Sequence, residues 1–199
     1  HLVTGDLTDM SSLMRALAPV LADRPNVMLL MHCRLADEGG DIRDTHSKFR
    51  RDIAARMKAT GYPDKEIGFP RDHLNALYNA ADIYVSVSSE GFGLTIAEAI
   101  ACGIPAVGMD YSSVPEVIGP AGKVAPLAGL VDNEYGHFWG CVNERAFGKL
   151  VADLLDNPAE LALLGAKGPE HVRRNFSWKH AAAQFGELAE KATQIMVAA

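Results

Sequence analysis

Residues 82–107 read DIYVSVSSEGFGLTIAEAIACGIPAV and predict a strand, a turn, a helix and a second strand in succession. The run Asp82–Val87, DIYVSV, predicts a strand. Leu94–Cys102 has apolar residues at the period of a helix, and Gly103 is typical of the position after a helix end. Strands that alternate with helices favour a parallel sheet, so this stretch indicates the fold class.

The same alternation continues along the rest of the chain. Further strands are expected at 27–32, 65–69, 105–109 and 122–125, and helices at 9–23, 45–60, 72–80, 143–156, from 158 onward and at 177–196. Residues 34–44 are expected to be a loop, and residues 1–10 contain hardly a strand. The predicted fold is α/β, a doubly wound parallel sheet with helices on both faces and additional C-terminal helices. We expect one domain over 1–176 and a closing helix over 177–199 that packs on it.

The composition is that of an ordinary globular protein, with 48% hydrophobic and 22% charged residues in a chain of 199. The net charge of −6 and the lack of a basic block argue against nucleic acid as a partner. The cysteines form no CxxC pair, so we expect no zinc site and a reducing, cytoplasmic setting. No apolar run has the length of a membrane span. The start at His1 rather than at a methionine suggests a fragment or a processed chain.

The Gly-Phe-Gly turn at residues 91–93 lies where open parallel sheets bind ligands, beyond the carboxyl end of a strand. Gly91 and Gly93 carry no Cβ, so the backbone can approach a ligand closely. The first amides of the following helix, from Gly93, Leu94 and Thr95, have no partner within the helix. Together with the helix dipole, these amides predict a seat for a diphosphate.

Two carboxylates flank this predicted seat. At 100° per residue, Thr95, Glu98 and Cys102 share one stripe of the helix, opposite the apolar stripe. Glu98 therefore lies about one turn beyond the seat, where a carboxylate suits the two hydroxyls of a ribose. Glu90 precedes the turn and can accept hydrogen bonds from hydroxyls of a sugar attached to the diphosphate. The two acids are spaced to serve the two ends of a sugar nucleotide.

The block from Glu90 through Gly-Phe-Gly-Leu-Thr to Glu98, followed by AIACGIPAV, resembles the signature of retaining nucleotide-sugar glycosyltransferases of the GT-B architecture. Glycogen synthases, sucrose synthases and bacterial mannosyl- and glucosyltransferases belong to this group, the glycosyl transferases group 1. The similarity extends to NALYNAADIYVSVS before the block, to SVPEVIG at residues 113–119 and to FSWKHAAAQF at residues 176–185. It covers the chain from about Pro25 to the C-terminus, which corresponds to one Rossmann-like, C-terminal donor-binding domain.

The resemblance implies a retaining hexosyltransferase that moves a sugar from a UDP- or GDP-linked donor to an acceptor hydroxyl, with no metal and no other cofactor. It places Glu90 at the donor sugar as the catalytic candidate, and Glu98 at the ribose. It assigns the donor sugar and diphosphate to the turn and the helix start, Gly91, Phe92, Gly93, Leu94 and Thr95. It assigns the nucleobase to Phe69, Pro70 and Arg71.

The chain departs from the family pattern at its start. Family members begin this domain with a strand that is followed by an Arg and a Lys for the diphosphate, and residues 1–10 contain neither. The acceptor, a carbohydrate or another hydroxyl compound, is expected to bind through an N-terminal domain that this chain lacks. We therefore expect little activity from the chain alone, and we allow for peripheral membrane association of the full-length protein.

Plainer interpretations exist for each of these residues. Both glutamates can simply be solvated, and the glycines can serve only a tight turn. Arg71 can be a solvated residue at a helix start, and Asp37 with Glu38 fits a solvated loop better than a metal site. At the level of function, the alternatives are a stand-alone, non-catalytic nucleotide-sugar-binding module and a sugar-nucleotide epimerase on the same fold. No DxD sequence occurs, so a metal requirement is not expected.

Overall fold

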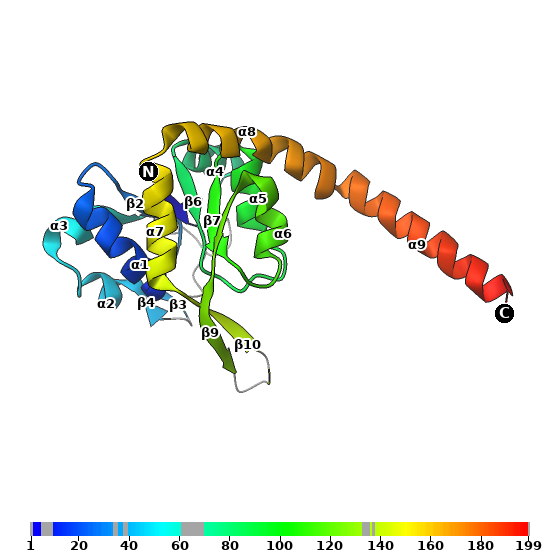
Figure 1. The fold of residues 1–199 in the computed structure, drawn as a ribbon, viewed down its shortest axis with the longest axis horizontal. Helices are drawn as coiled ribbons and strands as arrows, with labels where there is room; N and C mark the ends of the chain where they lie inside the picture. The colour runs from blue at the N-terminus through cyan, green and yellow to red at the C-terminus, as the bar shows by residue number, and fades with distance from the viewer. Residues whose placement is uncertain are drawn as a thin grey trace.

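A computed structural model of the chain describes residues 2–4, 10–33, 36–37, 40–60, 70–132, 136 and 138–198. At its centre lies a 6-stranded sheet whose strands all pair in parallel (Figure 1). The strands are β1 (Leu2–Thr4), β2 (Leu29–Met31), β5 (Met57–Ala59), β6 (Ile83–Val85), β7 (Ala106–Met109) and β8 (Gly122–Ala125). This sheet confirms the predicted α/β fold class.

The strands lie in the order β5-β2-β1-β6-β7-β8. The chain first adds strands outward on one side of β1 and then returns to place β6 on its other side. This is the Rossmann strand order, and its switch point lies between β1 and β6. Ligands of such sheets bind at the carboxyl ends of the strands beside the switch point. The segment that follows β6 therefore lies at the position where this fold binds ligands.

The first strand, β1, corrects the expectation that residues 1–10 contain hardly a strand. Leu2 pairs with Leu29 on one side and with Ile83 on the other, and its side chain is fully buried. The strand has only 3 residues, so its own sequence carries almost no periodic signal. Its position between two other strands, rather than its pattern, keeps it extended.

The two faces of the sheet have separate cores, because successive strand residues point to opposite faces. In β6, Ile83 and Val85 pack into one core and Tyr84 into the other. The first core contains side chains of α1 (Met10–Asp23) and α7 (Glu144–Leu155). The second contains side chains of α4 (Arg71–Asn79), α5 (Leu94–Ala101) and α6 (Val114–Ile118). Helices thus cover both faces, as a doubly wound sheet requires.

Helix α8 (Pro158–Asn175) packs closely on α5 and on the short 3-10 helix η1 (Gly119–Ala121). It begins where the sequence predicts, with the Asn157 side chain accepting a hydrogen bond from the Glu160 amide at 3.2 Å. A Cβ placed on Gly168 would lie 2.1 Å from the carbonyl oxygen of Ile100. Glycine is therefore required at this crossing, where the two helix backbones approach closely.

The segment 45–60 is not the single helix that its pattern predicts. It contains the end of α2 (Ile42–His46), then α3 (Arg51–Ala54) and then the edge strand β5. The amide of Leu29 donates to the Arg56 carbonyl at 2.9 Å, and the Thr60 amide donates to the Met31 carbonyl at 3.0 Å. Pairing with β2 thus satisfies backbone groups that a helix would satisfy internally, and tertiary context outweighs the helical pattern.

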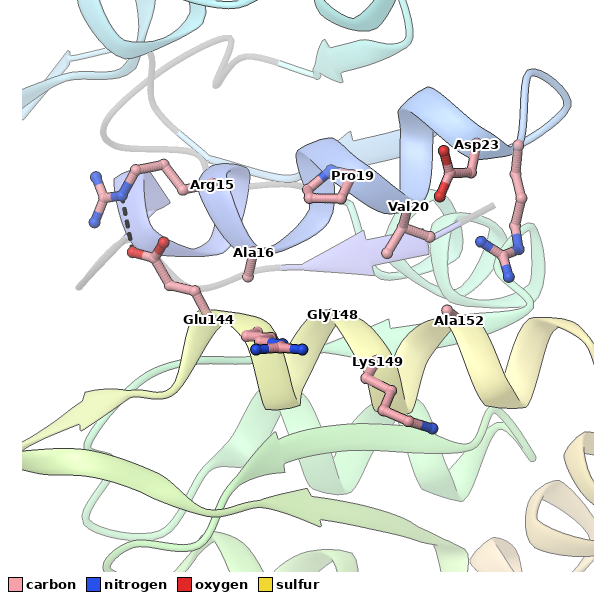
Figure 2. A pocket seen from close by; sticks show the side chains of 11 residues that line it. Arg15, Ala16, Pro19, Val20, Asp23, Glu144, Gly148, Lys149 and Ala152 are labelled. Carbon is pink, nitrogen blue, oxygen red and sulfur yellow. Dashed lines mark hydrogen bonds and ion pairs between the residues drawn. The ribbon is translucent and has the colours of Figure 1, made fainter.

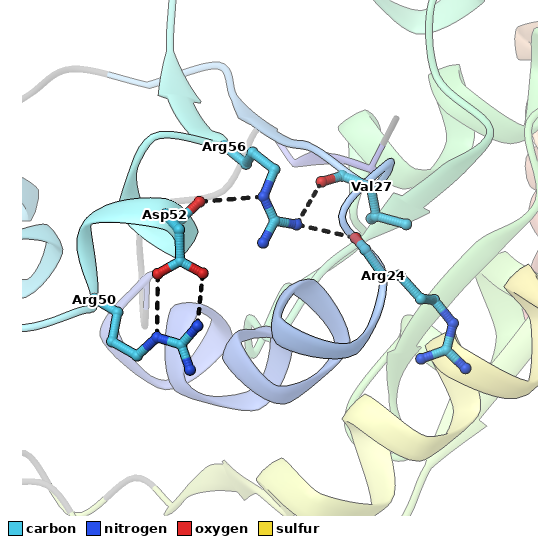
Figure 3. Close-up of polar contacts among 5 residues, drawn as sticks. All are labelled: Arg24, Val27, Arg50, Asp52 and Arg56. Atoms are coloured by element: carbon cyan, nitrogen blue, oxygen red, sulfur yellow. Dashed lines mark hydrogen bonds and ion pairs between the residues drawn. The ribbon is translucent and has the colours of Figure 1, made fainter.

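The Arg56 side chain ties this segment to the turn between α1 and β2 (Figure 3). Its Nη1 donates to the carbonyl oxygens of Arg24 at 2.9 Å and Val27 at 3.1 Å. Its Nε donates to the carbonyl oxygen of Asp52 at 3.1 Å. One guanidinium therefore joins α3 to the carbonyl groups left open by the α1–β2 turn.

Two further regions differ from expectation or lie outside the described residues. The segment 34–44, expected as a loop, contains the short antiparallel pair β3 (Ala36–Asp37) and β4 (Gly40–Asp41). The strand expected at 65–69 lies outside the described residues. An antiparallel hairpin, β9 (Leu127–Asp132) with β10 (Phe138–Val142), follows β8 and was not anticipated. It extends from the layered body in Figure 1.

The last helix, α9 (Trp178–Ala198), also extends away from the body (Figure 1). Residues 181–196 are all exposed, including Phe185 and Leu188. Phe185 and Leu188 of α9 are thus exposed in this structure, and the expectation of a closing helix over 177–199 stays a prediction. Among the described residues, no helix combines the length and apolar character needed to cross a bilayer.

Candidate functional site

The segment between β6 and α5 leaves the sheet beside the switch point. Ser86 and Ser88 are buried there, with their hydroxyl oxygens 3.3 Å apart. Residues 89–92 then come to the surface, where Gly91 and Phe92 are exposed, and Gly93 is buried again at the start of α5. The predicted donor-binding turn is thus at the carboxyl edge of the sheet, as the sequence indicates.

Gly93 forms the joint between the turn and α5. Its φ is +90°, a left-handed conformation that residues with a Cβ rarely adopt. Its carbonyl oxygen accepts the first bond of the helix, from the Ala97 amide at 3.0 Å. The amides of Leu94 and Thr95 precede this bond and are not used by the helix. They lie where the sequence places the diphosphate seat.

Helix α5 presents the two stripes expected from its period. Ile96, Ala97, Ala99 and Ile100 are buried, whereas Glu98 is exposed. Thr95 and Cys102, on the stripe of Glu98, are half-buried. The carboxylate of Glu98 therefore stands on the same surface as the helix start, which confirms the predicted geometry of the helix.

Tyr78 orients the carboxylate of Glu98, and sequence reasoning gave it no role. It is the last buried residue of α4, at 5% exposure, and its hydroxyl donates to Oε2 of Glu98 at 2.8 Å. Burial, with a smaller contribution from Glu98, raises the pKa of Tyr78, so the phenol stays protonated and remains a donor. A carboxylate has about four acceptor sites, so the others stay available for a ligand. The signal in the sequence was an aromatic residue with a polar tip just before strand β6.

Glu90 lies at the start of the turn and is half-buried. Its Oε1 accepts a hydrogen bond from the hydroxyl of Ser88 at 3.3 Å. Its backbone carbonyl is held separately, by the hydroxyls of Ser112 at 2.8 Å and Ser113 at 2.9 Å. The backbone of this residue is therefore held by two hydroxyls of the segment that leads into α6.

Ser113 holds two carbonyl groups of the turn at once. Its hydroxyl lies 2.9 Å from the carbonyl oxygen of Glu90 and also 2.9 Å from that of Phe92. Its neighbour Ser112 has a φ of +55°, which is uncommon for a residue other than glycine. The start of the SVPEVIG segment thus holds the Gly-Phe-Gly turn, a role that its sequence alone did not reveal.

The β9–β10 hairpin touches the same turn from the other side. The amide of Gly140 donates to the Ser89 hydroxyl oxygen at 3.3 Å. The hydroxyl of Tyr111 donates to the carbonyl oxygen of Phe138. A Cβ on Gly140 would lie 2.9 Å from the Tyr111 ring, so the strand can approach only because the residue is glycine. The hairpin therefore forms one wall beside the turn.

The nucleobase candidates are placed only in part. Pro70 and Arg71 are exposed at the start of α4, and Phe69 lies outside the described residues. Their position beside a nucleobase stays a prediction. Among the described residues, no group of three or more His, Cys, Asp or Glu side chains gathers as metal ligands would.

Two other reactive side chains, one after β2 and one at the C-terminal end of α5, have structural explanations. His32 follows β2, is buried, and places its Nδ1 2.8 Å from the hydroxyl oxygen of Thr60. Burial lowers the pKa of His32, which favours the neutral ring. The thiol of Cys102 lies 3.6 Å from Asn75 Oδ1, and burial, aided by Glu98, raises the pKa of Cys102. Neither residue has the features of an activated nucleophile.

A groove of about 360 Å³ lies elsewhere, between α1 and α7 (Figure 2). None of its lining residues is a predicted site residue. Four cations line it, and three of them, Arg15, Arg24 and Lys149, are paired with Glu144, Asp156 and Asp153, at 2.8, 2.5 and 2.6 Å. The fourth is Arg145. Because most of these charges are paired with carboxylates, the groove is a weaker candidate for an anionic ligand than the turn before α5.

Comparison with known proteins agrees with this geometry. A family model described as glycosyl transferases group 1 matches residues 3–135. A GDP-mannose-dependent monoacylated alpha-(1-6)-phosphatidylinositol monomannoside mannosyltransferase from Corynebacterium glutamicum is 28% identical over 176 residues, which are 84% of this chain and 40% of that protein. An MMP alpha-(1->4)-mannosyltransferase from Mycolicibacterium hassiacum is 36% identical over 126 residues, 63% of this chain and 28% of that protein. The chain thus spans less than half the length of these relatives.

A solved structure shares the fold. The Anabaena protein Alr3699/HepE in complex with UDP superposes with a TM-score of 0.71 at 18% identity, over 96% of this chain and 48% of that chain. The family match includes the turn, both glutamates and most of the sheet. This chain belongs to the glycosyl transferases group 1 family.

Proposed function

We propose that this chain is the donor-binding half of a hexosyltransferase, which moves a sugar from a nucleoside diphosphate to an acceptor hydroxyl with retention and without a metal. The observation that carries the proposal is the position of the Glu90–Glu98 block. It follows β6 at the switch point of a Rossmann sheet, where the fold itself provides a ligand site. Nothing favours the stand-alone binding module or the epimerase, and neither is proposed.

Different residues of the block bind different parts of the donor in this proposal. The amides at the start of α5 receive the diphosphate, since they are not used by the helix and lie at its positive end. Glu98, oriented by Tyr78, accepts from the ribose hydroxyls. Glu90 lies on the sugar side, where its carboxylate accepts from sugar hydroxyls and stands at the reacting centre. Pro70 and Arg71, with Phe69, flank the base.

The leaving diphosphate must be stabilised as its negative charge develops. In this proposal the backbone amides of Gly93, Leu94 and Thr95 supply donors that are already oriented, which is the usual protein solution where no metal takes part. The motif contains no lysine or arginine, so a further cation comes from elsewhere in the protein. Acceptor binding is placed in a second domain, as the partial coverage of the relatives supports.

A GDP-linked mannose is the donor to test first. The name of the C. glutamicum relative includes GDP-mannose, and the M. hassiacum relative is also named a mannosyltransferase. The Anabaena structure contains UDP, so UDP donors form the second arm of the test. We place the protein in the cytoplasm, where nucleotide sugars are made, with a peripheral membrane contact if its acceptor is a lipid.

Isothermal titration of the chain with GDP, UDP and GDP-mannose tests the proposal. We expect at least one nucleotide to bind, and we expect EDTA to leave its affinity unchanged. Affinity that disappears in EDTA and returns with Mg²⁺ or Mn²⁺ would overturn the metal-independent part. No binding by any of the three would overturn the donor-binding part. A radiolabelled-donor assay that compares the chain with its longer parent protein then tests where the acceptor binds, since we expect transfer only from the parent.

A further inference from the structure

Phe92 lies between two glycines, which have no side-chain carbon. It is therefore the only residue of the Gly-Phe-Gly turn whose side chain can hold the turn by packing. Its ring is 38% exposed, and its inner edge meets the ring of Phe176. The two ring centroids are 5.3 Å apart at an interplanar angle of 81°, an edge-to-face contact of favourable geometry. Phe176 follows directly after α8, more than eighty positions along the chain.

Phe176 is itself held from its other side by His171. Their ring centroids lie 5.3 Å apart at 90°. The Nε2 of His171 lies 3.2 Å from the Glu116 carbonyl oxygen and 3.1 Å from that of Val117. Its Nδ1 lies 3.0 Å from the side-chain nitrogen Nδ2 of Asn175. These contacts on both ring nitrogens fix the orientation of the His171 ring. Three rings in a row connect the end of α6 to the donor-binding turn.

The same helix α6 also reaches the turn directly. Ser113, just before α6, holds the carbonyl oxygens of Glu90 and Phe92. The serine fixes the main chain of the turn but leaves the Phe92 side chain free to rotate. Phe176 supplies the contact that fixes this ring, and so completes the support of a turn whose two glycines contribute none.

We propose that Phe176 is a positioning residue for nucleotide-sugar binding, which acts by holding Phe92 and so keeping the amides at the start of α5 in binding geometry. The inference rests on the proposed function of the turn. Without the Phe176 ring, the turn samples more conformations, and binding must then reorder it at a cost in affinity. The interaction energy typical of such an aromatic pair corresponds to a loss of nucleotide affinity of about three- to tenfold.

A double-mutant cycle on the full chain tests this role, with GDP and UDP titrated into each variant. We expect Phe176→Ala to weaken nucleotide affinity by about three- to tenfold, and Phe176→Leu to lose less because it keeps apolar volume. In a Phe92→Ala background, Phe176→Ala should have no further effect. Equal losses in both backgrounds would overturn the proposal, because they would show that Phe176 does not act through Phe92.

Two control variants separate positioning from stability. Val172→Ala removes apolar volume one turn earlier on α8, in the same core, and should lower the melting temperature without changing affinity. Phe185→Ala removes an exposed ring of α9 and should change neither. If Phe176→Ala lowered the melting temperature as Val172→Ala does and left affinity intact, its role would be structural only, and the proposal would be wrong.

Amide hydrogen exchange of the ligand-free chain distinguishes this inference from the proposed function. We expect Phe176→Ala to speed exchange at residues 91–94, and Val172→Ala to leave those amides as in the wild type. If the wild-type chain bound no nucleotide, the proposed function would fail, and the exchange comparison would still decide whether Phe176 holds the turn. Unchanged exchange at 91–94 would overturn the positioning role in either case.

Discussion

The two halves of the candidate site are held in place by different means. The turn half, residues 88–93, is fixed by side chains and backbone groups of distant segments: Ser113, Gly140 and Phe176 all contact it. The helix half, α5, is fixed by its own hydrogen bonds and by the packing of one apolar stripe. The turn therefore depends on polar and ring contacts from distant segments, whereas α5 depends on its own hydrogen bonds, on its buried stripe and on its close contact with α8.

The largest expected effect lies in the helix half. Glu98→Ala should weaken nucleoside diphosphate binding by about 2–4 kcal/mol, because two charge-assisted hydrogen bonds to a ribose are lost. Calorimetry measures this, with Glu187→Ala on the exposed helix α9 as the matched control. Unchanged affinity in Glu98→Ala would remove the ribose from this position and would leave the turn as the only binding element.

The joint between the halves should be the most sensitive point for stability. Gly93→Ala places a Cβ 3.1 Å from Ile96 Cδ1 and forces a left-handed conformation, at a cost of about 1–2 kcal/mol. Gly91→Ala is the matched control, since nothing lies within 4 Å of its added Cβ. Urea denaturation of both variants makes the comparison. Equal stabilities would mean that the joint is less constrained than its φ of +90° indicates.

In the turn half, Ser113→Ala should lower the stability of the turn by about 1 kcal/mol, because the carbonyl groups of Glu90 and Phe92 lose a hydrogen-bond donor. Ser112→Ala removes a bond to only one of them and should cost less. Amide exchange at residues 90–93, together with nucleotide affinity, measures the effect. If Ser112→Ala proved the more damaging change, the turn would depend on the strained residue rather than on the shared hydroxyl.

The smallest expected effect is that of Tyr78→Phe, which should weaken nucleotide binding by about 0.5–1 kcal/mol by freeing the Glu98 carboxylate to rotate. The change should vanish in a Glu98→Ala background, where there is no carboxylate to orient. Titration of the two single variants and the double variant checks this. A persistent effect would assign Tyr78 a direct contact with the ligand.

Much of the helix half was predictable, because its signal is local. The period of residues 94–102 placed the buried stripe and the exposed Glu98 correctly, and the strand before it located the sheet edge. The hydroxyl of Tyr78 was missed because its contact depends on how α4 returns to the sheet, across 20 positions. The sequence placed α4 but contained nothing about the direction of this one side chain.

The turn half and the outer parts of the sheet were harder to predict for the same reason. Ser113 lay in a segment that resembled the family, yet its bond to Phe92 arises only when two separate turns meet. The sequence of β5 has a helical pattern, and its pairing with β2 makes it a strand. Strand β1 is too short to show a period. Local pattern therefore placed the candidate site at the carboxyl edge of the sheet, and tertiary contacts determined how the turn is held there.

Backbone amide chemical shifts during a GDP titration test whether the turn and the start of α5 bind a nucleoside diphosphate. We expect the largest shift changes at residues 91–95 and at Glu98, with smaller changes at Ser113 and near Tyr78. We expect no comparable changes in the groove between α1 and α7. If the largest changes fell in that groove and residues 91–98 were unaffected, the turn would not be the nucleotide site.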